Sequence, residues 1–138
     1  MNFNSENKSI YNDIVKCHAV KMTFKGSSFK NKTSTRNQSL HYKNYFKSKD
    51  PSNWVSKVYS YEGITYQNIY EGIDYKSYYS EGGLKYDFVV RAETDPNLIS
   101  MEYKGAKSID IVNGELRIKT TLAEIVEQKP IAYQIIEG

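Results

Sequence analysis

This sequence contains little cysteine, little proline and no long hydrophobic run. The single cysteine, Cys17, cannot form an internal disulfide and excludes a zinc site built from several cysteines. No stretch approaches the ~20 apolar residues of a membrane-spanning helix. The polar N-terminal segment MNFNSENKSIYNDIVK shows no secretory signal. We therefore expect no membrane span and no disulfide scaffold.

Motifs for the common catalytic chemistries are also missing. Gly26-Ser27-Ser28 is not followed by the Gly-Lys-Ser/Thr of a phosphate-binding loop, and no Gly-x-Ser-x-Gly elbow occurs. His18 and His41 are 23 positions apart in the sequence, and neither has a second ligand at metal-binding spacing. The sequence therefore predicts no metal, no cofactor and no catalytic residue.

Aromatic residues are abundant: 13 Tyr, 5 Phe and 1 Trp among 138 residues. Such residues favour half-buried β-strands, and short runs separated by turn signals indicate a sandwich-like sheet. We predict an all-β, mainly antiparallel sandwich-like sheet built of consecutive hairpins. It would be one domain over residues 1–138 with flexible segments at 1–13 and 26–40.

The predicted elements follow from alternation and turn residues. One short helical turn is expected at 50–54, because Asp50 can cap it and Pro51 suits its first position. The expected strands are 19–24, 64–70, 73–79, 84–90, 98–104, 107–112, 115–120, 123–128 and 131–136.

An Asn-Gly pair predicts one hairpin in detail. Asn113-Gly114 tolerates the positive φ angles of a type I′ turn and so fixes the register of 108–119. That register puts four apolar residues on one face and an oppositely charged pair on the other: Ile111 opposite Leu116, Ile109 opposite Ile118, and Asp110 opposite Arg117.

A second hairpin joins 73–79 to 84–90 through a four-residue loop, Ser-Glu-Gly-Gly. A turn at Gly82-Gly83 is the alternative, and it would change the partners but not the faces. Tyr75 and Tyr79 share a face with Ile73, so we expect both in the core. The expected cross-strand partners are Tyr75 with Phe88, Tyr79 with Leu84, and Lys76 with Asp87.

Charge is unevenly distributed along the chain. Residues 1–57 carry 11 Lys or Arg and 3 Asp or Glu, whereas residues 58–138 carry 8 and 13. A basic segment can bind nucleic acid, but it is more often a solvated arm. We do not expect nucleic acid as a partner.

Tyr and Trp beside acidic residues suggest a speculative ligand site, because exposed aromatic rings can stack on sugars. Asp74 and Asp87 lie on adjacent predicted strands, as a carboxylate-based hydrolase would require, but Asp87 is predicted to face Lys76. The candidate ligand-binding residues are Trp54, Tyr70, Asp74, Tyr78 and Asp87.

Several segments resemble a known family in their order and spacing. The chain is similar to the domain of unknown function that precedes SBBP-type β-propeller repeats in large secreted or surface-attached bacterial proteins. The segments that carry the resemblance are Asn44-Tyr45-Phe46, Asp50-Pro51-Ser52-Asn53-Trp54, Tyr66-Gln67-Asn68-Ile69-Tyr70-Glu71-Gly72-Ile73-Asp74, Leu84-Lys85-Tyr86-Asp87-Phe88-Val89-Val90, Asp95-Pro96, Tyr103-Lys104-Gly105-Ala106 and Gln128-Lys129-Pro130-Ile131-Ala132-Tyr133-Gln134.

The resemblance implies an extracellular or cell-surface location and supplies no active site. The family's upstream strands and downstream strand pair have no counterpart here, and Ala123 stands where the family has a turn glycine. We therefore expect a copy that is incomplete at both ends, with open sheet edges that allow self-association.

The function expected from the sequence is a non-catalytic structural or interaction module of a bacterial surface protein. Its partner would be a neighbouring domain or another protein. A carbohydrate-binding module using Tyr and Trp platforms is the first alternative, and a carboxylate-based hydrolase is the second.

Overall fold

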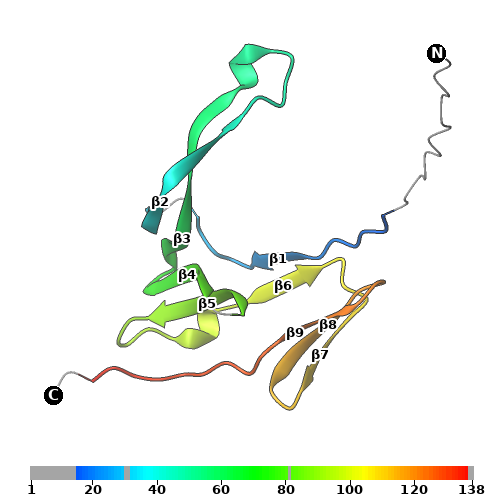
Figure 1. The fold of residues 1–138 in the computed structure, drawn as a ribbon. Coiled ribbons are helices and arrows are strands. Elements are labelled where there is room, and N and C mark those ends of the chain that lie inside the picture. The colour runs from blue at the N-terminus through cyan, green and yellow to red at the C-terminus, as the bar shows by residue number, and fades with distance from the viewer. Residues whose placement is uncertain (1–14, 30–31, 81, 137–138) are drawn as a thin grey trace, which may run out of the picture. The chain divides into compact units, whose positions relative to one another are not determined.

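The structure is a computed structural model that describes residues 15–29, 32–80 and 82–136. Nine strands and two short 3₁₀ turns make up these residues (Figure 1). The strands are β1 (Lys21–Phe24), β2 (Thr33–Tyr45), β3 (Val55–Tyr70), β4 (Ile73–Ser80), β5 (Gly83–Val90), β6 (Met101–Lys104), β7 (Ser108–Val112), β8 (Glu115–Lys119) and β9 (Glu124–Glu127). The turns are η1 (Pro51–Asn53) and η2 (Pro96–Leu98).

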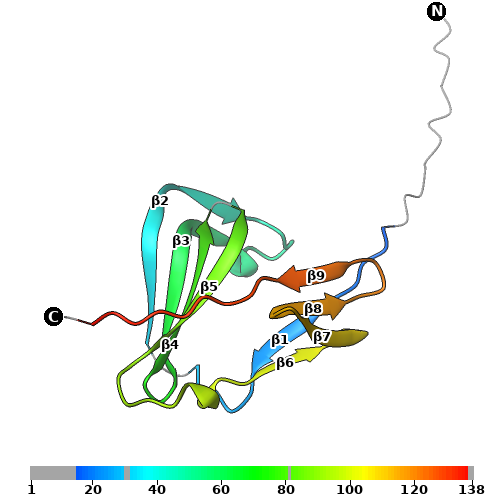
Figure 2. The ribbon, with the colours of Figure 1, turned by 90° about the horizontal axis from the view of Figure 1, so that it is seen from below.

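The strands form three sheets, with the orders β1-β6, β2-β3-β4-β5 and β7-β8-β9. Figure 2 shows the four strands of the second sheet side by side. The neighbouring strands in the two larger sheets pair antiparallel. The all-β, mainly antiparallel sandwich-like class is confirmed, and so is the limit of one or two helical turns. No described segment forms a helix long and apolar enough to cross a membrane.

The chain divides into two compact units, and each is described by itself. One unit is Phe24–Glu102, and the other joins the described residues before Phe24 to those from Tyr103 onward. The prediction of a single domain stays a prediction. The segment 1–13, predicted to be flexible, lies outside the described residues.

The core of the Phe24–Glu102 unit lies where β3 turns into β4. Ile69, Tyr70 and Ile73 are buried there. Five half-buried apolar residues pack against them: Phe24, Tyr66, Tyr75, Phe88 and Ile99. The β3–β4 and β4–β5 registers align Tyr66, Tyr75 and Phe88 across three strands. Aromatic side chains on neighbouring strands therefore supply most of this core.

Both predicted hairpins are confirmed in register. Asn113 and Gly114 have φ angles of 54° and 86°, as a type I′ turn requires. Each predicted partner pair of β7–β8 and of β4–β5 is observed. The β4–β5 ladder continues to Ser80 opposite Gly83, so the connection is shorter than the predicted four-residue loop.

Two side-chain expectations on these hairpins are corrected. Tyr79 shares a face with Tyr75 but is exposed, because it lies near the turn and beyond the residues that cover the core. Arg117 stands opposite Asp110, yet its ion pairs are with Glu115 (3.0 Å) and Glu124 (3.1 Å). Glu124 lies on β9, so the third strand supplies one of the partners of Arg117.

The loop expected at 26–40 is wrong over its second half, where β2 begins at Thr33. This strand pairs with β3 from Thr33 opposite Tyr66 to Tyr45 opposite Val55, with two register shifts. Nearly all of its residues are exposed, so no apolar alternation marks it in the sequence. The backbone ladder defines β2 and extends β3 back to Val55.

The strand predicted at 131–136 is also absent, because none of the described strands pairs with these residues. Two other strands begin later than predicted. The strand predicted at 19–24 begins at Lys21, and the strand predicted at 98–104 begins at Met101, after η2. The turn predicted at 50–54 is confirmed as η1, with Asp50 as its N-cap and Pro51 at its start.

Candidate interaction site

The turn between β3 and β4 is built on a bulge that the Asp74 carboxylate stabilises. The β3–β4 register shifts between Tyr66 and Tyr70, and Asn68 has a φ angle of 50°. Asp74 Oδ1 accepts the Asn68 N–H at 2.8 Å and lies 3.4 Å from Arg91 Nη2. The Asp74 side chain is thus engaged with this turn.

Tyr70 closes the same turn from the core side. Its hydroxyl lies 3.0 Å from the Lys25 carbonyl oxygen and 3.1 Å from that of Ser100, and it accepts the Ser100 N–H at 3.3 Å. A single hydroxyl hydrogen can serve one carbonyl at a time. Tyr70 therefore links three chain segments through hydrogen bonds in a largely buried position.

We expect Tyr70→Phe to lower the free energy of unfolding by about 1–3 kcal/mol, because backbone groups lose a buried partner. Urea denaturation followed by circular dichroism measures the change. Tyr79→Phe is the matched control: its side chain is exposed, and we expect a change within about 0.5 kcal/mol. Equal effects of the two substitutions would contradict a structural role for the Tyr70 hydroxyl.

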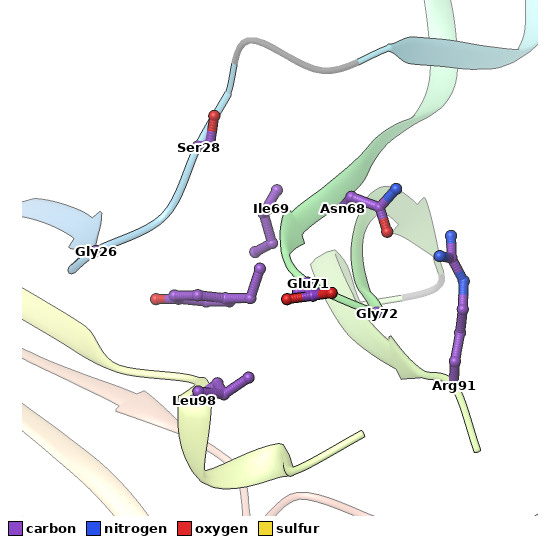
Figure 3. A pocket seen from close by; sticks show the side chains of 9 residues that line it. Gly26, Ser28, Asn68, Ile69, Glu71, Gly72, Arg91 and Leu98 are labelled. Carbon is purple, nitrogen blue, oxygen red and sulfur yellow. The ribbon is translucent and has the colours of Figure 1, made fainter. Parts of the chain in front are cut away.

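An open hollow of about 660 Å³ lies beside this turn (Figure 3). Its rim includes the Glu71 carboxylate and the Arg91 guanidinium, and Ile69 and Leu98 supply apolar surface. The other lining residues are Gly26, Ser28, Asn68, Tyr70 and Gly72. The hollow offers one charge of each sign and contains Tyr70, but Asp74 does not line it.

Tyr78 and Asp87 are brought together on β4 and β5. The Tyr78 hydroxyl donates to Asp87 Oδ1 at 3.2 Å, and the Arg36 guanidinium carbon lies 5.8 Å from the centre of the Tyr78 ring. Tyr78 lines a second hollow of about 300 Å³ together with the aromatic residues Tyr61 and Tyr79. Asp74 stands opposite Val89, so Asp87 is its diagonal neighbour. Each carboxylate already accepts a hydrogen bond from its own surroundings.

Trp54 lies apart from these residues, at the η1 end of the β2–β3 hairpin. Its ring packs edge-on against Phe46 with centroids 5.0 Å apart, and its Nε1–H donates to the Ser48 carbonyl at 2.8 Å. Val55, next to Trp54, and Gly63, which faces Tyr78, are separated by roughly 26 Å of strand. The structure therefore does not gather the five predicted ligand residues into one site.

The cap beside Trp54 gives a pH prediction. The Ser52 backbone N–H donates to Asp50 at 2.9 Å. This bond, and then the Ser52 side chain, lower the pKa of Asp50 below its ordinary value of 3.8. A lowered folded-state pKa means that the cap contributes stability above the unfolded-state pKa and loses it as pH falls through the folded-state pKa.

An NMR titration of the Asp50 carboxyl carbon should therefore give a midpoint below 3.8. In Ser52→Ala the backbone bond remains, so the midpoint should rise only part of the way back. A midpoint at or above 3.8 in the parent chain would contradict the capping role of Asp50.

Large apolar side chains are exposed at many positions in the described residues. Four hydrophobic residues are buried in the parts of the chain that the structure describes: Ile69, Tyr70, Ile73 and Ile118. By contrast, the segment 131–136 exposes Ile131 by 89 %, Tyr133 by 82 %, Ile135 by 82 % and Ile136 by 81 %. Large exposed apolar areas mark surfaces that contact other molecules.

Strand edges add to this surface. β5 is the outer strand of the four-stranded sheet, and its eight residues pair with β4 without a register shift. Leu84 at its start is 77 % exposed. The apolar alternation of 131–136 was visible in the sequence as a strand pattern, but its lack of a partner strand was not. We define two separate candidate interaction surfaces: the β5 edge of the Phe24–Glu102 unit, and the segment 131–136 of the other unit.

Comparison with known proteins places the chain in a family whose role is unknown. No curated protein and no solved structure matches it significantly. A family model described as "Domain of unknown function" matches residues 2–138. The chain therefore belongs to the DUF7948 family of domains of unknown function.

Proposed function

We propose that this chain is a non-catalytic structural or interaction module that packs against a neighbouring domain or another protein. The observation that carries the proposal is the exposed apolar surface at 131–136, in a chain whose described residues include few fully buried side chains. Burial of such surface contributes roughly 25 cal/mol per Å². Contact with a partner would therefore stabilise the module and the complex together.

The setting that we propose is an extracellular or cell-surface bacterial protein in which the module orients or caps a β-propeller array. Support comes from the resemblance in the segments that contain Asp50–Trp54, Tyr66–Asp74, Leu84–Val90 and Gln128–Gln134. In the structure, the second of these segments forms the bulged turn and most of the buried core, and Leu84–Val90 lies on the sheet edge. These two segments therefore help to form the core of the Phe24–Glu102 unit and the edge of its four-stranded sheet.

Carbohydrate binding is the second candidate, and one observation favours it. Tyr61, Tyr78 and Tyr79 line the hollow of about 300 Å³, where aromatic rings could receive a sugar. Two of the five predicted ligand residues already have internal partners: the Tyr70 hydroxyl bonds to the Lys25 carbonyl, and the Asp74 carboxylate accepts the Asn68 N–H. A carbohydrate site would therefore centre on Tyr78 rather than on Trp54.

Two measurements on the full chain separate the candidates. An interaction module should show a sedimentation coefficient that rises with protein concentration and no retardation in polysaccharide gels. Retardation that Tyr78→Ala abolishes, in a chain that remains monomeric at every concentration, would replace the proposal with carbohydrate binding. Tyr45→Ala, which changes an exposed tyrosine outside both hollows, is the control for nonspecific loss.

A further inference from the structure

The segment 131–136 has the properties of a β-strand that lacks a partner. In an extended chain Ile131, Tyr133 and Ile135 share one wholly apolar face, and Ala132, Gln134 and Ile136 share the other. In Figure 1 the chain after β9 runs on as an extended ribbon without an arrow. Pro130 has no N–H, so a ladder could begin only after it.

Among the strands that the structure describes, β5 is the edge best suited to receive it. β2 is also an edge strand, but register shifts interrupt its pairing, and bulged edges resist further pairing. β7 has five residues and β9 has four, and β9 begins and ends with glutamate. β5 offers eight residues in continuous register, enough for the six residues of the segment.

The side-chain patterns of the two strands also match. Leu84, Phe88 and Val90 lie on one face of β5, and Lys85 and Asp87 lie on the other. A strand added at this edge could place its three alternating apolar residues beside the apolar face of β5. Aromatic and β-branched residues on neighbouring strands stabilise a sheet in this way, and main-chain hydrogen bonds supply the affinity of such strand addition.

We propose that residues 131–136 of one copy add as a fifth strand to the β5 edge of a second copy. Each copy carries one donor segment, residues 131–136, and one acceptor edge, β5. Donors and acceptors are therefore always present at equal concentration. The proposal rests on the proposed interaction function and specifies its partner and its mode. Because donor and acceptor are different surfaces, reciprocal exchange gives a closed dimer and one-way exchange gives a longer chain.

Disulfide trapping between copies tests the proposal. In a Cys17→Ser background, chains with Leu84→Cys are mixed with chains that carry Ile131→Cys, Tyr133→Cys or Ile135→Cys, under glutathione redox buffer. Leu84 is exposed, so its substitution should not disturb folding. Paired strands bring the thiols to millimolar effective concentration. We expect at least one donor position to give about tenfold more linked heterodimer than unpaired collisions.

The matched control moves the acceptor thiol to the opposite face of β5. Lys85→Cys stands one residue along, where its side chain points away from Leu84 and should trap no donor above background. Equal yields from Leu84→Cys and Lys85→Cys would overturn the proposal. So would a chain carrying both Leu84→Cys and Ile135→Cys that closes only onto itself and remains a monomer after oxidation.

Sedimentation of the same variants before oxidation separates this inference from the proposed function. Association that rises with concentration, without selective trapping, would overturn strand addition at β5 and leave an interaction module in place. A chain that sediments as a monomer at every concentration would count against self-association and the strand exchange together.

Discussion

Ile73→Ala should lower the free energy of unfolding by about 2–5 kcal/mol, because truncating a fully buried isoleucine leaves a cavity. Ile73 is 0 % exposed and packs in the cluster with Ile69 and Tyr70. It also forms the first pair of the β4–β5 ladder, opposite Val90. Guanidinium denaturation followed by far-ultraviolet circular dichroism measures the loss.

Ile111→Ala is the matched control for Ile73. Ile111 is also an isoleucine on a β-strand, but its side chain is 77 % exposed. Its truncation therefore removes little buried surface. We expect a change below about 0.5 kcal/mol. Similar losses for the two variants would show that the β3–β4 turn is not the core of its unit.

Gly105→Ala should cost on the order of 2–4 kcal/mol, the combination of a positive φ angle and a steric conflict. Gly105 has a φ angle of 92°, and a Cβ there would lie 2.5 Å from the Ala19 carbonyl oxygen. That oxygen belongs to the backbone and cannot rotate away. The Gly105 carbonyl also accepts the His18 Nε2–H at 2.7 Å, so a backbone shift would disturb this bond as well.

Gly82→Ala separates the two contributions. Gly82 has nearly the same φ angle, 95°, but a Cβ there would meet nothing within 4 Å. Its substitution should cost about 1–2 kcal/mol, the conformational part alone. If Gly105→Ala and Gly82→Ala lowered the unfolding free energy equally, the close approach of Gly105 to Ala19 would be contradicted.

The hairpins were predictable because their information is local. Asn113 and Gly114 fix a turn type, the turn type fixes a register, and the alternation of Ile109 and Ile111 agrees with that register. The β4–β5 hairpin is similar, since apolar side chains on both strands favour one alignment. Tyr79 shows the limit of this reasoning, because a residue on the core face is exposed where the core ends.

β2 was not predictable from its composition. Most of its residues are polar and nearly all are exposed, so its strand structure depends on the ladder with β3 and on contacts such as Tyr42 against Tyr59, with ring centroids 5.7 Å apart. At 131–136, by contrast, the sequence pattern predicted a strand that the structure does not contain. A strand pattern is a property of one segment, whereas a strand needs a second segment to pair with.

The predicted ligand residues show a similar division. Tyr78 and Asp87 are brought together, as their places on neighbouring strands suggested. Tyr70 and Asp74 were chosen for their chemistry, but the Tyr70 hydroxyl bonds to the Lys25 backbone and the Asp74 carboxylate accepts the Asn68 N–H. No local sequence pattern could reveal these partners, because one depends on the bulge at Asn68 and the others on distant backbone at Lys25 and Ser100. Residue type alone therefore overstated the number of groups available to a ligand.

Hydrogen–deuterium exchange of the amides in 131–136, measured over a range of protein concentrations, tests the central claim most directly. Strand addition between copies predicts fast exchange at low concentration and increasing protection as the concentration rises, because the ladder forms only in the assembly. Leu84→Pro removes an N–H that points to the open edge of the acceptor strand and not to β4, and it should reduce this protection. Fast exchange at every concentration, or protection that does not depend on concentration, would contradict the claim that 131–136 is a strand shared between chains.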